Sequence, residues 1–300
     1  MSWICPMCST ANDDKLFHCM VCDAEKQILT YGFDISDDMD AEKRWKYGLS
    51  ALAEGRKEDA FESFMFGAAQ GYAPAENEVG SCFYSGKGVE RDLKQAVEYF
   101  SISAAKGWAK AQYNLACCYF YGNGTEQNTR MAVQYFTMAA EQGHAKAKYL
   151  LGTCYYYGKG VEQDNIQAFM YFSQAADQGV PQAQFNTGFC YENGFGVKRD
   201  FTKAFRYYSL ASMQNDCPAL NAMGNCYFFG TGTKKNEENA AIFYRKAADL
   251  GFTPAEYNYG FCCENGIGTA KDKEAAKRWY RRAADKKHTG AINALDRLLR

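Results

Sequence analysis

Four cysteines near the N-terminus have the spacing of a metal site. Cys5 and Cys8 form one C-x2-C pair, and Cys19 and Cys22 form a second pair after ten intervening residues. Two such pairs can direct four thiolates toward one Zn²⁺, which fills every coordination position and leaves none for a substrate. We therefore predict one structural zinc ion in a module at residues 1–25. A segment this short is too small to bury a core, so it needs the metal to fold.

Other side chains that commonly perform catalysis form no motif in this sequence. The three histidines, His18, His144 and His288, lie far apart, and we expect them on the surface or at the cysteine knuckles. Paired glycines of the form Gly-x-Gly recur six times, but they lack the third glycine or the Lys-Ser/Thr pair of a phosphate-binding loop. We predict that the chain is not an enzyme and has no catalytic residues.

The glycine pairs belong to a tandem repeat with a step of 36 residues. The same step connects the first glycine of each pair, from Gly86 to Gly266, and an alanine column that begins at Ala96. A further alanine column consists of Ala75, Ala111, Ala147, Ala183, Ala219, Ala255 and Ala291. Because several columns keep one register, residues 73–288 are predicted to be six copies of one structural unit.

Each unit has the pattern of two helices joined by a tight turn. The apolar residues of the first half have helical spacing, and the glycine pair that follows supplies the left-handed backbone at which a helix can end. Asp or Asn stands six residues after the first glycine, for example Asp92 or Asn128, and both are favoured helix N-caps. The second half again has apolar residues three to four positions apart. Such units bury their apolar faces only by stacking on their neighbours.

This pattern resembles the Sel-one-like repeat (SLR), a relative of the tetratricopeptide repeat. The run Leu151-Gly152-x-x-Tyr155-x-x-Gly158-x-Gly160-Val161 carries the resemblance, which covers residues 73–300. It implies an all-α fold, namely a right-handed α-solenoid of helical hairpins. It also implies a non-enzymatic scaffold or adaptor, with a partner peptide or helix bound on the concave face of the repeat array.

The segments around the six repeats have their own patterns. Residues 26–40 are rich in aspartate and are predicted to be a linker. Residues 41–72 look like a degenerate first hairpin, because their alanine and phenylalanine columns match the repeat while the inter-helix turn lacks Gly-x-Gly. Residues 289–300 correspond to a lone first helix, and we predict that this helix caps the stack.

Three columns of the first helix differ among the repeats and are candidates for a partner-binding surface. They combine rings, which supply apolar contact, with amides, which can bind peptide backbone. We expect the first column to be the most exposed. The candidates are Asn77, Tyr113, Tyr149, Phe185, Asn221 and Tyr257 in the first column, Phe189 and Phe261 in the second, and Tyr84, Phe120, Tyr156 and Phe228 in the third, which also contains Glu192 and Glu264. The alternative is that many of these rings fill space between hairpins.

A cysteine column repeats with the same step. Successive members lie one repeat apart, roughly 10 Å, which is too far for a shared metal ion or a disulfide. We interpret them as small residues buried between helices, where a thiol behaves as a compact hydrophobe. The column contains Cys82, Cys118, Cys154, Cys190, Cys226 and Cys262.

The N-terminal module also resembles a known family. Trp3 and Asn12, placed around the cysteines, make residues 3–22 similar to the Ran-binding-protein zinc finger, and a zinc ribbon is the competing interpretation. The resemblance implies an alternative function as a ubiquitin-binding or nucleic-acid-binding adaptor. The chain has Ser9-Thr10 where the ubiquitin-binding type has Thr-Phe, and Asp13-Asp14-Lys15 where the RNA-binding type has arginines. These departures disfavour both activities.

Composition limits the partners further. The formal net charge is -1, so the chain as a whole does not attract nucleic acid or an anionic membrane, and we expect a protein partner. No apolar run approaches the roughly 20 residues of a membrane span, and the first residues lack the pattern of a secretory signal. The sequence contains 13 cysteines, which fits a reducing compartment in the absence of such a signal, so we expect a cytoplasmic location.

Overall fold

The structure is a computed structural model that describes residues 40–299, and all regular secondary structure in this range is helical. The helices are α2 (Ala41–Ala53), α3 (Lys57–Ala69), α4 (Ala73–Ser85), α5 (Leu93–Ala105), α6 (Ala109–Tyr121), α7 (Thr129–Glu141), α8 (Ala145–Tyr157), α9 (Asn165–Asp177), α10 (Pro181–Asn193), α11 (Phe201–Ser212), α12 (Cys217–Phe229), α13 (Glu237–Asp249), α14 (Thr253–Asn265), α15 (Lys273–Asp285) and α16 (Thr289–Leu299). Consecutive helices form hairpins, so the predicted all-α solenoid is confirmed.

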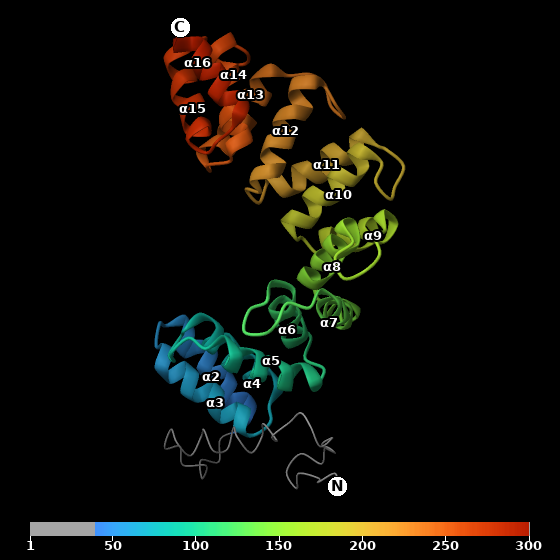
Figure 1. Cartoon of the computed structure of the whole chain (residues 1–300), viewed down its shortest axis with the longest axis vertical. Coiled ribbons are helices and arrows are strands. Elements are labelled where there is room, and N and C mark those ends of the chain that lie inside the picture. Colours follow the sequence, from blue (N-terminus) through green and yellow to red (C-terminus); the bar gives the residue numbers. More distant parts are fainter. Residues whose placement is uncertain (1–39, 300) are drawn as a thin grey trace. The chain divides into compact units, whose positions relative to one another are not determined.

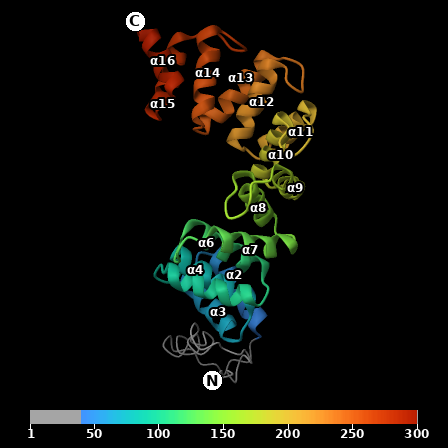
Figure 2. The same ribbon diagram turned by 45° about the vertical axis from the view of Figure 1, so that its right-hand side comes forward.

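The described helices belong to two compact units. Unit 1 holds the described residues up to Ala147 together with Lys159–Val161, and unit 2 holds Lys148–Gly158 and the residues from Glu162 onward. In unit 1 the hairpins are α2–α3, α4–α5 and α6–α7, which follow one another in chain order (Figure 1). In unit 2 the hairpins are α8–α9, α10–α11, α12–α13 and α14–α15, and α16 packs on α15 (Figure 2).

The polar column that begins each second helix caps it as predicted. Asp92 accepts hydrogen bonds from the backbone N–H groups of Lys94 and Gln95, at 2.9 and 3.1 Å, and the equivalent residue of every other repeat accepts one or two such bonds. These bonds satisfy amides that have no partner inside the helix. The local chemistry of one residue type therefore fixes where all six second helices start.

The second glycine of each Gly-x-Gly pair lies close against the backbone of the preceding hairpin. A Cβ added at Gly196 would lie 1.9 Å from the carbonyl oxygen of Asn165, the first residue of α9, and one at Gly124 would lie 2.0 Å from the Leu93 carbonyl oxygen. Both glycines also have positive φ. Only a residue without a side chain allows this approach.

Alanines and cysteines line the buried interface between helices. Ala75, Ala96 and their equivalents are almost entirely buried, and all six members of the cysteine column are at most 3% exposed. This confirms the interpretation of that column as small core residues. Burial raises the pKa of the Cys190 thiol to about 12, so it stays protonated and unreactive at neutral pH.

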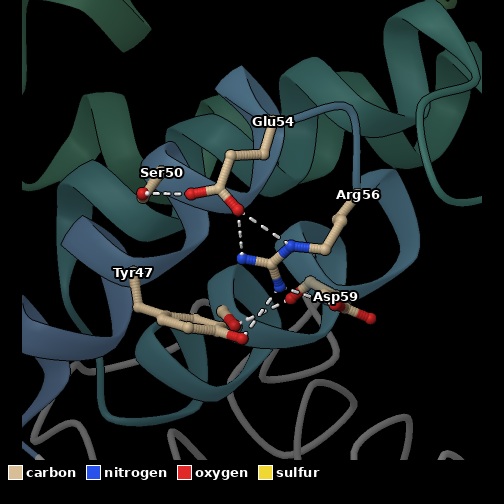
Figure 3. Close-up of polar contacts among 6 residues, drawn as sticks. Tyr47, Ser50, Glu54, Arg56 and Asp59 are labelled. Carbon is tan, nitrogen blue, oxygen red and sulfur yellow. Dashed lines mark hydrogen bonds and ion pairs between the residues drawn. The ribbon is translucent and has the colours of Figure 1, made fainter.

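The α2–α3 turn, which has no glycine pair, is organised by an arginine (Figure 3). The Arg56 guanidinium donates to Glu54 Oε2 at 2.8 and 3.1 Å, to Asp59 Oδ2 at 2.7 Å and to the Tyr47 hydroxyl at 2.9 Å. Ser50 donates to the other oxygen of Glu54 at 3.1 Å. Hydrogen bonds from Arg56 and Ser50 lower the pKa of Glu54. Because these groups lie at the surface, the cluster shapes the turn more than it stabilises the chain.

Candidate functional site

The predicted zinc module lies outside the described residues. Its four ligands, Cys5, Cys8, Cys19 and Cys22, and the linker up to residue 39 precede the first described residue, so the zinc site stays a prediction. Within residues 40–299, no group of three or more His, Cys, Asp or Glu side chains could hold a metal ion. No helix in that range is both long and apolar enough to cross a lipid bilayer.

The three candidate columns are less exposed than expected, and their order of exposure differs. Asn77 in the first column is completely buried, so the expectation that this column is the most exposed is wrong for that residue. The other members of the first column are partly buried. The most exposed candidates belong to the other columns: Tyr84 is 36% exposed and Phe261 is 37% exposed, whereas Phe120 is buried.

Two asparagines of the first column hold neighbouring hairpins together. The Asn114 side-chain amide donates to Asn77 Oδ1 at 2.9 Å, and Asn258 donates to Asn221 Oδ1 at 2.8 Å. Asn77 also donates to Glu78 Oε1 at 3.1 Å. These amides are therefore used within the chain, because buried polar groups need hydrogen-bond partners.

Two tyrosines of the first column stack on histidines that occupy one position of the repeat. Tyr113 lies 4.5 Å from His144, and Tyr257 lies 4.8 Å from His288, measured between ring centroids. Each histidine Nδ1 accepts a hydrogen bond from a backbone N–H in the first turn of the next helix, from Ala147 at 3.2 Å in the case of His144. Burial, helped by two nearby lysines, lowers the pKa of His144.

The expectation that these histidines are scattered surface residues is therefore wrong. His144 and His288 are four repeat steps apart. Both are partly buried and stand immediately before the N-terminus of the helix that follows, α8 or α16. Asp216 stands at the same repeat position and accepts from the backbone N–H of Ala219 at 2.9 Å. The shared role is that of an N-cap, which the repeat step could have revealed in the sequence.

The glutamates of the third column satisfy buried tyrosines. The Tyr208 hydroxyl donates to Glu192 Oε2 at 2.6 Å, and the Tyr280 hydroxyl donates to Glu264 Oε2 at 2.8 Å. Burial raises the pKa of both tyrosines, and the carboxylates add to that shift. Arg297 binds the same carboxylate of Glu264 from α16, at 2.6 and 2.7 Å. Both carboxylates are therefore already hydrogen-bonded within the chain.

Three predicted residues do meet at an open pocket in unit 2. The pocket has a volume of about 180 Å³, and its walls include Tyr156 from α8, Phe172 from α9, and Phe185 and Phe189 from α10. The rings pack in pairs. The ring centroids of Phe185 and Phe189, which are stacked, lie 6.4 Å apart, and those of Tyr156 and Phe172, which are tilted, lie 6.5 Å apart.

The remaining lining residues are Tyr157, Asn186 and Cys190, so the pocket has no charged side chain. Tyr157 is 63% exposed and forms one edge of the opening. The side-chain amide of Asn186 makes no hydrogen bond to any described residue, in contrast to the side-chain amides of Asn114 and Asn258 at the same repeat position. Burial keeps the Cys190 thiol protonated, so the pocket offers a ligand aromatic rings and one side-chain amide.

Comparisons with known proteins agree with this description. The family model described as Sel1 repeat matches six consecutive segments, residues 73–108, 109–144, 145–180, 181–216, 217–252 and 253–288, which confirms the predicted array. The chain is similar to a protective antigen of uropathogenic Escherichia coli strains with an SLR fold, at 27% identity and a TM-score of 0.78 over 93% of this chain and 59% of that one. It thus spans less than two thirds of that protein.

A second similar structure is a Sel1 repeat protein from Oxalobacter formigenes, at 29% identity and a TM-score of 0.74 over 80% of this chain and 96% of that one. No curated protein matches the chain. Sel1 repeats typically form scaffolds for protein–protein interaction, and the matches indicate no catalytic family. Because the repeat model covers residues 73–288 of 300, the chain belongs to the Sel1 repeat family.

Proposed function

We propose that the chain is a non-enzymatic scaffold that binds a partner protein on the first-helix face of unit 2. By this face we mean the surface of α8 and α10 that carries Tyr156, Phe185 and Phe189. The open aromatic pocket is the observation that carries the proposal. An exposed apolar recess with a few polar groups at its edge is typical of a recognition site.

The rest of the described chain supports binding over catalysis. The thiols of the cysteine column are buried, and the histidine and glutamate side chains near the candidate columns are engaged in capping and packing. The nine cysteines in the described range are all free, which supports a reducing compartment such as the cytoplasm.

A peptide selection tests this proposal. Random peptides displayed on phage are selected against the full chain, and the recovered peptides are measured by fluorescence polarisation. We expect binding to weaken at least about tenfold in Phe185→Asn, because a pocket wall is lost. This substitution places in repeat four the residue that repeat five already has at Asn221.

The matched control is Ile166→Asn on α9, at a side chain that is 68% exposed and does not line the pocket. Binding should be unchanged in this variant, and both variants should keep the helical circular dichroism of the parent. Peptides that bind the parent and Phe185→Asn equally well would show that the partner surface lies elsewhere.

A further inference from the structure

We infer that the pocket of unit 2 receives one phenylalanine side chain of an extended partner peptide, and that Asn186 pairs with the peptide backbone beside that phenylalanine. The inference rests on the proposed function and specifies what the partner must carry. Three observations support it: the size and chemistry of the pocket, the unpaired side-chain amide of Asn186, and an equivalent aromatic set elsewhere in unit 2 whose amide is bonded.

The size and lining of the pocket select an aromatic hydrocarbon side chain. An apolar cavity of roughly 150 Å³ holds a benzene ring in proteins, and this pocket measures about 180 Å³. Phe172, Phe185 and Phe189 offer ring faces and edges, and an inserted ring can pack on them edge-to-face. A charged side chain would lose its hydration without gaining a partner, because no charged group lines the pocket.

Asn186 gives the site its polar specificity. At this repeat position Asn114 donates to Asn77 and Asn258 donates to Asn221, because the preceding repeat offers an asparagine. The preceding repeat offers Asn186 a tyrosine instead, Tyr149, whose ring packs on Phe172 at 6.0 Å. The amide of Asn186 thus keeps one acceptor and two donors available, which match the N–H and C=O of a peptide bond.

Unit 2 contains a second set of aromatic residues at the same repeat positions, and in that set the neighbouring amide already has a partner. Phe228, Phe229, Tyr257 and Phe261 correspond to Tyr156, Tyr157, Phe185 and Phe189. There, however, Phe228 and Phe261 contact each other edge-to-face at 6.4 Å, and the neighbouring amide, Asn258, is already bonded. The pocket of about 180 Å³ thus lies beside the set whose neighbouring asparagine, Asn186, has an unbonded side chain.

Ligand titrations on the full chain test the inference. The probes are acetyl-Gly-Gly-Phe-Gly-Gly-amide, the same peptide with Ala in place of Phe, and toluene, which has the ring and no peptide bond. Affinities are measured by saturation-transfer NMR. The variants are Phe189→Asn, which removes a pocket wall, Asn186→Ala, which removes the amide, and Phe261→Asn as the matched control in the second aromatic set. Asn225 occupies this position in repeat five, so the fold accommodates asparagine there.

We expect the phenylalanine peptide to bind at least about tenfold more tightly than the alanine peptide, since only it buries a ring. Phe189→Asn should weaken both the peptide and toluene about tenfold, and Phe261→Asn should change neither. Asn186→Ala should weaken the peptide several-fold and leave toluene binding unchanged, because toluene has no group that hydrogen-bonds to the amide.

Equal binding of the two peptides, or unchanged binding of the phenylalanine peptide to Phe189→Asn, would overturn the inference. A loss of toluene binding in Asn186→Ala equal to the loss of peptide binding would overturn the role given to the amide. If the phenylalanine peptide fails to bind while phage-selected peptides still depend on Phe185, the inference falls and the scaffold function stands. If no peptide of either origin binds the chain, the proposed function falls as well.

Discussion

Replacing Gly196 by alanine should separate two neighbouring hairpins of unit 2, whereas the same change at Gly194 should not. Both glycines have positive φ, +67° and +77°, so an alanine costs about 1–2 kcal/mol of backbone strain at either place. At Gly194 the nearest atom to an added Cβ is 3.6 Å away, which is ordinary contact. The predicted cost of Gly194→Ala is therefore the strain alone.

At Gly196 the added Cβ would lie 1.9 Å from the Asn165 carbonyl oxygen and 2.4 Å from its carbon. These are backbone atoms at the start of α9, so no side-chain rotation relieves the clash. The hairpins must move apart by roughly 1.5 Å to restore normal contact. Overpacking of this kind adds about 1–3 kcal/mol. We expect Gly196→Ala to lower the free energy of unfolding by about 2–5 kcal/mol in total.

Urea unfolding followed by circular dichroism compares the two variants with the parent, and hydrogen exchange shows whether the α9–α11 amides lose protection first. A third variant, Gly179→Asn, serves as a control. Gly179 has positive φ with nothing within 4 Å, and the chain itself carries Asn215 with φ 60° at the same repeat position. Its cost should be the smallest. If Gly196→Ala costs no more than Gly194→Ala, close approach between hairpins is not what requires the second glycine.

Three further predictions concern other contacts. Because burial lowers the pKa of His144, the stability that this residue contributes is present above the unfolded pKa of about 6.5 and is lost as pH falls through the folded pKa. His144→Asn keeps an N-cap and should therefore reduce the fall in melting temperature below neutral pH. A fall equal to that of the parent would contradict the role of His144 as a cap. Tyr208→Phe should lower the free energy of unfolding in urea by about 1 kcal/mol. Adding Glu192→Tyr to this variant should restore most of that free energy, since repeat three has the same pair as Tyr156 and Phe172. Simple additivity of the two single effects would contradict the coupling. The full chain should carry one zinc ion by elemental analysis, which Cys5→Ser with Cys22→Ser removes; equal zinc in the variant would refute the module.

The fold could be predicted because its determinants are local and repeated. The N-cap at Asp92 depends on a side chain and the two amides that follow it, and the sequence displays that chemistry six times. The first helices end at Gly86 and its equivalents because the backbone there adopts a positive φ. Glycine is the residue that favours this conformation, so the sequence alone indicates these helix ends. Because a single 36-residue unit cannot bury its apolar face alone, the repeat also predicts that the hairpins stack on one another.

The sequence does not reveal that the two glycines of a pair have different structural roles. Both glycines are present in all six repeats, so the sequence does not distinguish Gly194, which needs a left-handed backbone, from Gly196, which also needs contact with another hairpin. The difference lies in a carbonyl group 31 positions earlier in the chain, at Asn165. A close approach between repeats is visible only once the repeats are stacked.

Exposure of the candidate columns was unpredictable for a related reason. Asn77 is buried because Asn114 of the next hairpin covers and bonds it, so the environment of one column member depends on a residue 37 positions away. Phe261 and Phe189 occupy the same column, yet Phe261 contacts Phe228 whereas Phe189 borders an open pocket. Residue type alone therefore did not identify the pocket.

Residues that vary within a repeat column often reflect packing inside the chain, so variation alone does not indicate a binding surface. Glutamate occupies the third column only where the second helix of that repeat presents a tyrosine, as with Glu192 and Tyr208, and an aromatic residue occupies it where that helix presents Phe172. Each exchange is compensated by a partner inside the chain, so it needs no ligand to explain it. The side chain of Asn186 differs, because its repeat position supplies a bond in two other repeats and no residue of the described range bonds it here. A variable position whose compensating partner is missing is the one that points outward, toward another molecule.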